Sequence, residues 1–196
     1  VFYFGGGWRV GSPEQFFPFC LALKARGIAC FAPDYRVSSR QGTDAIDALH
    51  DAQSAYRWVV SKGDKYGVDK SQIYVGGGSA GGHLAAAVAM IPSKSITRAP
   101  AGMLLFNPGV DIGRSARIQG LFRNQAEQYS PIEYVRPSLP GAWIIHGKAD
   151  EVVPYSTVVD FCRRMDSAGN ACELLGFDGE GHGFFNARRR AYDEVL

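Results

Sequence analysis

Short apolar runs of strand length alternate along the chain with longer segments in which apolar residues recur every three or four positions. The apolar runs lie at residues 1–4, 28–32, 73–75, 102–106, 142–146 and 172–177. Segments of helical periodicity lie at residues 13–26, 43–62, 84–90 and 154–167. This alternation predicts a mostly parallel sheet of about six strands with helices on both faces. Ser12 and Thr43 are the expected N-caps of the first two helices.

One long stretch, from Val110 to Pro140, shows no clear period and carries Pro131, Pro137 and Pro140. A segment of this length without regular structure inside a compact domain is typically a lid or an insertion. We therefore expect residues 1–196 to form one domain, in which residues 110–140 form a cap or a wall of the pocket.

Composition narrows the class of protein. The chain has 196 residues, 46% of them hydrophobic and 20% charged, with a net charge of +2. This balance gives no electrostatic reason to expect a nucleic acid or an anionic membrane as partner. The one basic run, Arg188-Arg189-Arg190, is typical of a solvated helix face. No apolar stretch reaches membrane-spanning length.

The first residues already have the pattern of a buried strand, and the chain begins with Val1 rather than Met. We therefore expect an upstream segment that this sequence lacks, together with any targeting signal. The compartment, cytoplasmic or secreted, and the oligomeric state stay open.

Four cysteines lie in apolar helix or strand patterns, namely Cys20, Cys30, Cys162 and Cys172. None forms a C-x-x-C pair, and we predict buried free thiols. The equal spacing within the first two and within the last two leaves pairing open. Cysteines and histidines do not cluster at the spacing of metal ligands, so we expect no catalytic metal and no cofactor.

The strongest chemical motif is Gly77-Gly78-Ser79-Ala80-Gly81, a G-x-S-x-G pattern. It follows the strand-like run Ile73-Tyr74-Val75 and precedes a run of good helix formers. A serine between strand and helix, with small residues two positions away on both sides, is typical of a nucleophile elbow. The alternative is an ordinary glycine-rich loop. A phosphate-binding loop is disfavoured because no Lys-Ser/Thr follows the glycines.

Candidate catalytic residues follow three of the predicted strands. Ser79 comes after the third strand, Asp150 after the fifth and His182 after the sixth. A serine hydroxyl needs a histidine to take its proton, and the histidine needs a carboxylate to fix its tautomer. The order nucleophile, acid, histidine is the one expected for an α/β-hydrolase.

Other residues compete for these roles. His50 and His83 fall in predicted helices and His146 inside a predicted strand, whereas His182 lies in a glycine-flanked loop. For the acid, Glu151 and Asp111 are the alternatives, but Asp150 comes first after its strand.

An oxyanion hole requires backbone N–H donors beside the nucleophile. The glycine loop after the first strand and the helix start after Ser79 supply such donors, and we predict Gly5, Gly6 and Ala80. Trp8 fits a pocket wall or the core equally well, and it joins Asp111 and Val153 as candidate residues of the substrate pocket. Asp34, Tyr35 and Arg36 are expected to brace loops near the site.

Five motifs together resemble the α/β-hydrolase superfamily, and within it the esterase/lipase group related to hormone-sensitive lipase and to bacterial acetyl-xylan and feruloyl esterases. They span nearly the whole chain in the order of that group: Phe4-Gly5-Gly6-Gly7-Trp8, Pro33-Asp34-Tyr35-Arg36, Gly77 to Gly82, His146-Gly147-Lys148-Ala149-Asp150 with Val153-Pro154, and Gly181-His182-Gly183-Phe184.

The resemblance implies the α/β-hydrolase fold over residues 1–196, without the first two strands of the usual eight. It also implies Ser79 as nucleophile, Asp150 as acid and His182 as base. Two positions depart from the group's pattern. Phe4 replaces the usual histidine that helps to hold the oxyanion loop, and Gly78 stands where the group often has a polar residue.

We therefore expect a serine hydrolase that cleaves small carboxylic esters through an acyl-enzyme, with a small-molecule ester as its partner. An arylformamidase or a peptidase of the prolyl-oligopeptidase type would use the same three residues. A catalytically silent binding module with this fold is the alternative from another class.

Overall fold

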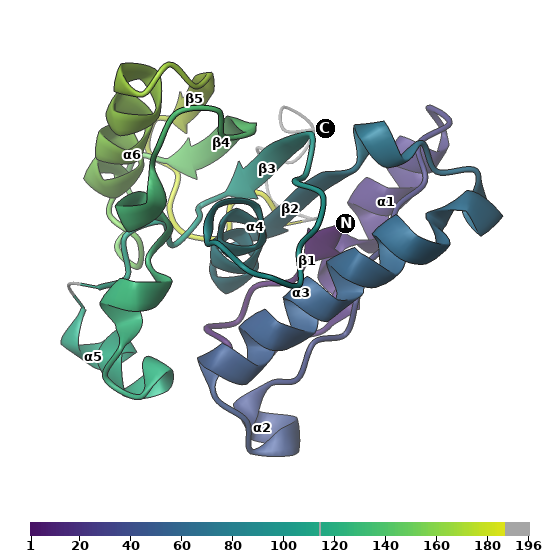
Figure 1. Ribbon diagram of the computed structural model, residues 1–196. Coiled ribbons are helices and arrows are strands. Elements are labelled where there is room, and N and C mark those ends of the chain that lie inside the picture. The colour runs from purple at the N-terminus through teal and green to yellow at the C-terminus, as the bar shows by residue number, and fades with distance from the viewer. Residues whose placement is uncertain (114, 187–196) are drawn as a thin grey trace.

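Five parallel strands form the centre of the part of the molecule that the computed structural model describes, residues 1–113 and 115–186 (Figure 1). They lie side by side in the order in which they occur along the chain. The strands are β1 (Phe2–Tyr3), β2 (Tyr74–Gly78), β3 (Gly102–Phe106), β4 (Gly141–Gly147) and β5 (Cys172–Phe177). Because the strands are parallel, the loops that follow them meet at one edge of the sheet.

Helices alternate with these strands, as the hydrophobic pattern predicts. The α-helices are α1 (Phe17–Lys24), α2 (Ser38–Gln41), α3 (Ala45–Lys62), α4 (Ala80–Met90), α5 (Ala116–Gln119) and α6 (Tyr155–Ser167). Short 3-10 helices lie at Pro13–Phe16, Gly63–Tyr66, Lys70–Gln72, Gly120–Phe122, Ala126–Tyr129 and Pro131–Tyr134. None of the described helices is both long and apolar enough to cross a membrane.

One of the two predicted N-caps differs in the structure. The N-cap of α3 is Asp44 rather than Thr43, because its carboxylate accepts the N–H groups of Ile46 and Asp47 in a capping box. Ser12 is the N-cap of the helix that begins at Pro13, as predicted, although its side chain makes no capping hydrogen bond.

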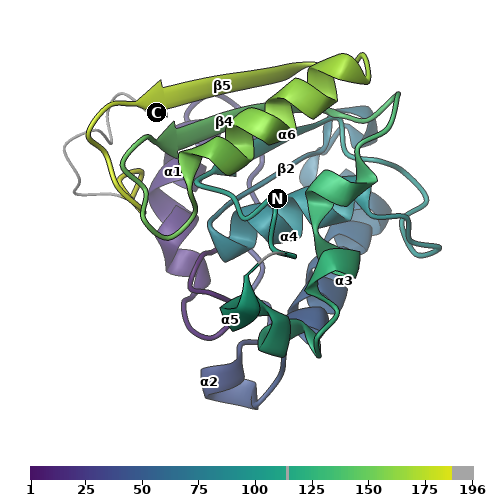
Figure 2. The same ribbon diagram turned by 90° about the vertical axis from the view of Figure 1, so that its left-hand side faces the viewer.

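Helices cover both faces of the sheet, and adjacent residues of β1 show which helices cover which face. The ring of Phe2 stacks on Phe16, with 5.0 Å between the ring centroids, on the face that α1 covers. The hydroxyl of Tyr3 donates to the carbonyl oxygen of Ala52 in α3, at 2.8 Å, on the opposite face. Successive side chains of a strand point to opposite faces, so one core lies on each side of the sheet. Figure 2 shows α6 alongside β4 and β5.

The predicted strand at residues 28–32 is not a strand in the structure. One backbone hydrogen bond ties it to β1, from the N–H of Phe2 to the carbonyl oxygen of Phe31, at 2.8 Å. A single bond does not make a ladder, and Ile28 is half exposed.

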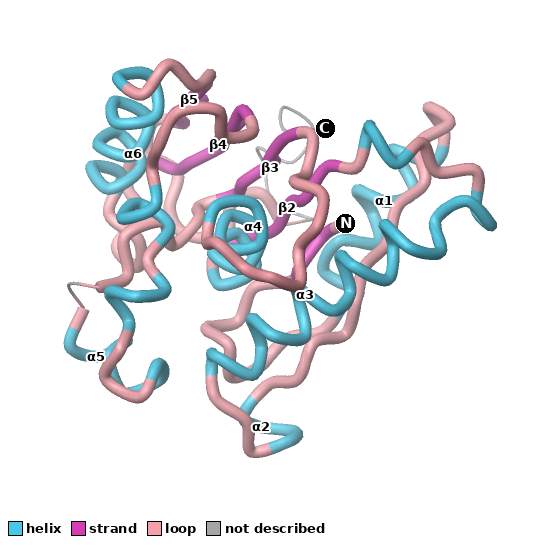
Figure 3. The backbone as a smooth tube through the Cα atoms, in the orientation of Figure 1, coloured by secondary structure: helices cyan, strands magenta, loops and turns pink. Residues whose placement is uncertain are grey.

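The stretch at residues 110–140 is not without regular structure either. It contains α5 and three short 3-10 helices, separated by loops (Figure 3). Helices of three or four residues are too short to leave a periodic pattern of apolar positions, so the pattern does not predict them. The basic run at residues 188–190 lies outside the described residues.

The prediction of free thiols is wrong. Cys20 in α1 is bonded to Cys30, and Cys162 in α6 is bonded to Cys172 at the start of β5, with Cα–Cα distances of 5.3 and 5.2 Å. In both cases a helix ends, the chain turns, and the next segment runs back beside the helix. This return brings together two cysteines that lie far apart on an extended chain.

Candidate active site

Ser79 occupies a sharp turn between β2 and α4. Its φ of 54° is a conformation that a residue with a side chain rarely adopts. A Cβ atom at Gly77 would lie 2.5 Å from the carbonyl oxygen of Tyr3, and one at Gly81 would lie 2.0 Å from the same atom. Only glycine fits at either position, so the neighbouring backbone holds this strained turn in place.

The structure brings Ser79, His182 and Asp150 into one hydrogen-bonded chain. Nε2 of His182 lies 2.9 Å from Oγ of Ser79, and Nδ1 of the same ring lies 2.7 Å from Oδ2 of Asp150. These residues follow β2, β5 and β4, whose ends meet at the same edge of the sheet. The Asp150 side chain is fully buried, whereas His182 retains 22% of its side-chain exposure. A ring that is held at one nitrogen by a buried carboxylate, lies at the other beside a hydroxyl and is partly exposed can pass a proton between that hydroxyl and an incoming molecule.

Donors surround the carboxylate of Asp150. Oδ1 accepts the N–H groups of Val152 and Val153, at 2.8 and 2.9 Å. Oδ2 accepts from Nδ2 of Asn107 at 2.5 Å, in addition to His182, and Nε2 of His146 lies 3.3 Å away.

Burial would raise the pKa of Asp150, but the hydrogen bonds from His146, His182 and Asn107 outweigh it and hold this pKa well below its ordinary value. The carboxylate is therefore charged at neutral pH. Sequence reasoning missed Asn107, and it placed His146 only as an unlikely base inside a strand.

The glycine loop after β1 lies beside Ser79, but it differs from the prediction at its first glycine. The N–H of Gly5 donates to Oε1 of Gln15 at 2.5 Å, so this donor is already engaged. Among the described residues, the N–H groups of Gly6 and Gly7 have no partner. This contact argues against Gly5 as an oxyanion donor, whereas in the described part of the chain the N–H groups of Gly6 and of Ala80, at the start of α4, have no hydrogen-bond partner. A glycine is needed at Gly6, because a Cβ there would lie 2.1 Å from the carbonyl oxygen of Val10.

Comparison with known families decides which fold family this geometry belongs to. A family model described as alpha/beta hydrolase fold matches residues 1–136, more than half of the chain. The chain belongs to the α/β-hydrolase family. A second model, described as the prolyl oligopeptidase family, matches residues 111–196.

Relatives of this hydrolase place it in the esterase/lipase group. The structure of Thermogutta terrifontis esterase 2 phosphoramylated by tabun is 40% identical, covers 100% of this chain and 78% of that chain, and has a TM-score of 0.94. The propionate-bound structure of the same esterase has 40% identity and a TM-score of 0.93, with the same coverage. Esterase LipC of Mycobacterium tuberculosis is 28% identical to this chain, and the match covers 94% of this chain and 52% of LipC. The chain therefore spans about half the length of this relative.

Both departures from the group's pattern have a physical explanation in this hydrolase. A Cβ at Gly78 would lie 2.4 Å from the ring of Phe185, so the aromatic core excludes a side chain directly before Ser79. Phe4 is fully buried and stacks on Tyr35, with ring centroids 4.0 Å apart. The hydroxyl of Tyr35 donates to the carbonyl oxygen of Phe4 at 2.7 Å. An aromatic pair with a hydrogen bond therefore holds the start of the glycine loop.

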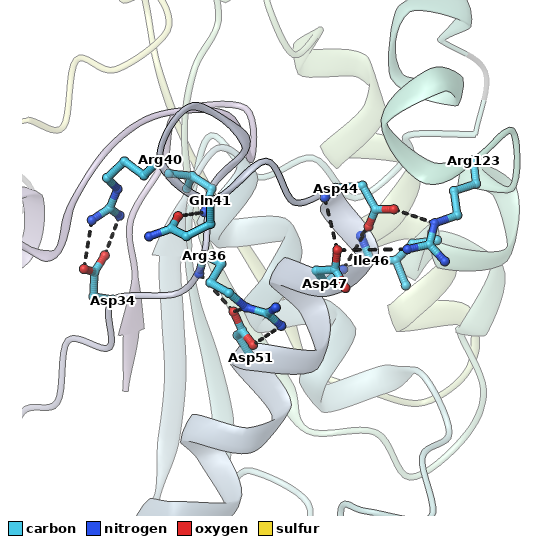
Figure 4. Close-up of polar contacts among 10 residues, drawn as sticks. Asp34, Arg36, Arg40, Gln41, Asp44, Ile46, Asp47, Asp51 and Arg123 are labelled. Carbon is cyan, nitrogen blue, oxygen red and sulfur yellow. Dashed lines mark hydrogen bonds and ion pairs between the residues drawn. The ribbon is translucent and has the colours of Figure 1, made fainter.

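Ion pairs brace the segment around this tyrosine, as expected for Asp34 and Arg36 (Figure 4). Two-point pairs join Arg40 to Asp34, at 2.6 and 2.9 Å, and Arg36 to Asp51 of α3, at 2.8 Å for both contacts. Arg40 also donates to the carbonyl oxygen of Gly11. The segment that carries Tyr35 is thereby tied both to α3 and to the end of the glycine loop.

The three residues predicted to line the substrate pocket of this hydrolase lie in different surroundings. Trp8 is 5% exposed and packs edge-on against His83 and Phe122, with both centroid distances 5.1 Å, so its indole belongs to the core. Asp111 is partly exposed, at the start of the stretch that follows β3. Val153 contributes its backbone, since its N–H donates to Asp150 and its carbonyl oxygen lies 2.9 Å from Nε2 of His146.

No group of three or more metal-ligating side chains occurs in the described part of the chain. A hollow of about 770 Å³ lies along β1 and residues 27–31, on the side lined by Tyr66 and Trp143. Neither Ser79 nor His182 lines it.

Proposed function

We propose that this α/β-hydrolase cleaves small carboxylic esters, with Ser79 as nucleophile, His182 as general base and Asp150 as the acid that orients it. The observation that carries the proposal is the hydrogen-bonded chain from Oγ of Ser79 through His182 to Asp150. The strained elbow supports it, because it presents the serine at the end of β2. The names of the relatives, which are esterases and carboxylic ester hydrolases, agree with it.

The geometry accommodates an acyl transfer in two steps. Oγ of Ser79 attacks the acyl carbon while its proton passes to Nε2 of His182, and the alcohol leaves with that proton. A water molecule then attacks the acyl-enzyme, gives its proton to the same nitrogen, and releases the carboxylic acid as Ser79 regains its proton. Asp150 holds the ring so that Nδ1 carries a proton and Nε2 is free to accept one.

Negative charge that develops on the substrate oxygen requires fixed donors. We assign this role to the N–H groups of Gly6 and Ala80, and the free N–H of Gly7 lies next to them in the chain. Ala80 stands at the first position of α4, where backbone N–H groups have no partner within the helix and the helix dipole favours an anion.

The substrate class rests on the solved relatives. Thermogutta terrifontis esterase 2 has been determined with propionate and with butyrate bound, and we propose acyl groups of similar size for this chain. Residues 110–140, with Asp111 at their start, are the proposed wall of the pocket.

A second reaction class is favoured by one observation, the match of residues 111–196 to the prolyl oligopeptidase family. A peptidase of that family would cleave an amide bond of its substrate rather than an ester bond. Rates on p-nitrophenyl acetate and p-nitrophenyl butyrate, measured beside a proline peptide amide, separate the two reactions. Faster turnover of the amide would move the proposal to a peptidase.

The test of the nucleophile is Ser79→Ala. Hydrolysis of p-nitrophenyl acetate should fall by at least about 10⁴-fold, because the attacking atom is removed. The exposed Ser167→Ala variant, in α6, should keep the wild-type rate. A fluorophosphonate should label the wild type at Ser79 in a 1:1 ratio. Full activity of Ser79→Ala would overturn the proposal.

A further inference from the structure

Gln15 connects two loops of the active site that lie far apart in sequence. Its Oε1 accepts the N–H of Gly5, at 2.5 Å, and its Nε2 donates to Oδ1 of Asn186, at 2.8 Å. The second contact spans 171 positions of the chain. One amide side chain therefore touches the glycine loop after β1 and the loop after β5.

Through Asn186, Gln15 is connected to Gly183, the residue that follows the candidate base His182. Asn186 donates from Nδ2 to the carbonyl oxygen of Gly183, at 2.8 Å, and its backbone N–H donates to the same oxygen. Gly183 follows His182 directly and has a φ of +79°, so it forms the turn that aims the histidine. The hydrogen bonds run without a gap from Gln15 to this turn.

The hydrogen bond between Gln15 and the N–H of Gly5 fixes the peptide that precedes the proposed oxyanion donor Gly6. A Cβ built on Gly5 would lie 3.4 Å from Cβ of Ser79, so Gly5 is a direct neighbour of the nucleophile. Its N–H points to Gln15, and the next N–H along the chain is that of Gly6. Because consecutive peptides share one Cα atom, fixing the Gly5 peptide restricts the direction of the Gly6 donor.

The sequence around Gln15 anchors it firmly. Pro13 begins the short 3-10 helix, and Phe16 at its end is fully buried against Phe2. Gln15 thus stands on a helix fixed in the core, and its side chain can act as a rigid spacer. Phe4 provides no polar side chain to the loop, since its ring lies on Tyr35.

We propose that Gln15 is a positioning residue for ester hydrolysis, which holds the Gly6 donor and the His182 turn in a fixed relation to each other. This inference rests on the proposed function. Loss of this positioning should destabilise the transition state more than the bound substrate. The Gly6 N–H stabilises negative charge that develops during the reaction, and His182 carries a proton that moves during it.

The principal test is Gln15→Met, which keeps the length of the side chain and removes both hydrogen bonds. We expect kcat on p-nitrophenyl acetate to fall about 10- to 100-fold, with KM within about twofold of the wild type. Rates are normalised to active sites titrated with a fluorophosphonate, so that a loss of folded protein does not count. The affinity of a trifluoromethyl ketone analogue of the transition state should fall in parallel with kcat/KM.

The two halves of the bridge are separated by Asn186→Ala, which leaves the contact of Gln15 with Gly5 intact. This variant should lose less kcat than Gln15→Met. The double variant should lose no more than Gln15→Met alone, because both changes break the same bridge. Gln72→Met, at an exposed glutamine at the end of the 3-10 helix Lys70–Gln72, is the matched control and should keep the wild-type kcat.

The outcomes distinguish this inference from the proposed function. If the wild type is inactive on esters, or if Ser79→Ala keeps its activity, the proposed function fails. If Ser79→Ala is inactive while Gln15→Met keeps kcat within about twofold and binds the ketone as the wild type does, the role of Gln15 is refuted. A purely additive double variant would refute the bridge.

Discussion

At the scale of single residues, the carboxylate of Asp150 is held by hydrogen bonds from two side chains and two backbone N–H groups. Asn107 provides the shortest of its hydrogen bonds, 2.5 Å from Nδ2 to Oδ2. Asn107 directly follows β3, is fully buried, and has a φ of 43°. Asparagine tolerates this left-handed conformation better than most residues. Asn107 therefore suits both the turn of the backbone after β3 and the hydrogen bond to Asp150.

Replacing Asn107 by glycine tests this contact without straining the backbone, because glycine adopts a positive φ freely. We expect kcat/KM to fall about tenfold, since the carboxylate that orients His182 loses a donor. The free energy of unfolding should fall by about 2 kcal/mol, the range for a hydrogen bond to a charged group.

The matched control for this prediction is Asn124→Gly, an exposed asparagine with a φ of 59°. Steady-state rates and urea unfolding give both quantities. An Asn107→Gly variant with the rate and stability of this control would show that the amide contributes nothing to the acid.

Sequence reasoning at this scale found residue types and missed partners. Their places after strands predict Ser79, Asp150 and His182, and the structure joins these three residues by hydrogen bonds. The engagement of Gly5 by Gln15 could not be predicted, because it depends on how a 3-10 helix lies against a loop ten residues earlier. The motif alone shows which backbone donors exist, but not which are occupied.

At the scale of elements, α4 is buried along its whole length, and α1, α2, α3 and α6 each have exposed positions. His83 is the one histidine in α4, and its ring is fully enclosed, with Nε2 2.7 Å from the carbonyl oxygen of Tyr129. Burial outweighs the favourable contact with this carbonyl and lowers the pKa of His83 from 6.5 to about 4. The imidazole is therefore neutral in the folded protein at pH 5.

This lowered pKa makes the stability depend on pH. Below pH 6.5 the unfolded chain takes up a proton at His83 that the folded protein refuses until about pH 4. The stability that His83 supports is thus complete above pH 6.5 and is lost as the pH falls through about 4. At pH 5 the loss should be about 2 kcal/mol relative to pH 8.

The variant His83→Gln, which keeps a donor for Tyr129, should flatten the pH dependence between pH 4 and 6.5. Urea unfolding at pH 5 and pH 8 measures it, and His50→Gln, at an exposed histidine of α3, should retain the wild-type slope. An unchanged slope in His83→Gln would assign the pH dependence to other groups.

Elements were predictable where their apolar pattern was long or was framed by turns. The helices α3, α4 and α6 and the strands β2 to β5 lie close to their predicted places. The segment at residues 28–32 has the composition of a strand but one hydrogen bond to β1, and composition does not reveal a partner. Short helices within residues 110–140 leave no period, so they were missed.

At the scale of the whole molecule, two disulfides tie a helix to the following segment at different positions along the chain. Each closes a loop of 10 residues, Cys20–Cys30 at α1 and Cys162–Cys172 at α6 and β5. A loop of this length should contribute about 3 kcal/mol by restricting the unfolded chain. The second disulfide fixes the beginning of the strand that leads to His182.

Replacing Cys162 and Cys172 together by serine should lower the free energy of unfolding by about 3 kcal/mol and reduce the midpoint of thermal unfolding. A reducing agent should lower the midpoint of the wild type by more than that of this double variant, which retains one disulfide. Four titratable thiols in the unreduced, denatured wild type would contradict both bonds.

The parallel sheet has one further consequence, which concerns the assembly of the site during synthesis. Its strands succeed one another in space as they do along the chain, so Ser79 and the glycine loop come from residues 1–113, and Asp150 and His182 from residues 115–186. The histidine follows the serine by 103 residues, and a nascent chain therefore carries the proposed nucleophile long before the proposed base. Two fragments divided near residue 114 would each be inert, and recovered ester hydrolysis would report their reassociation along β3 and β4.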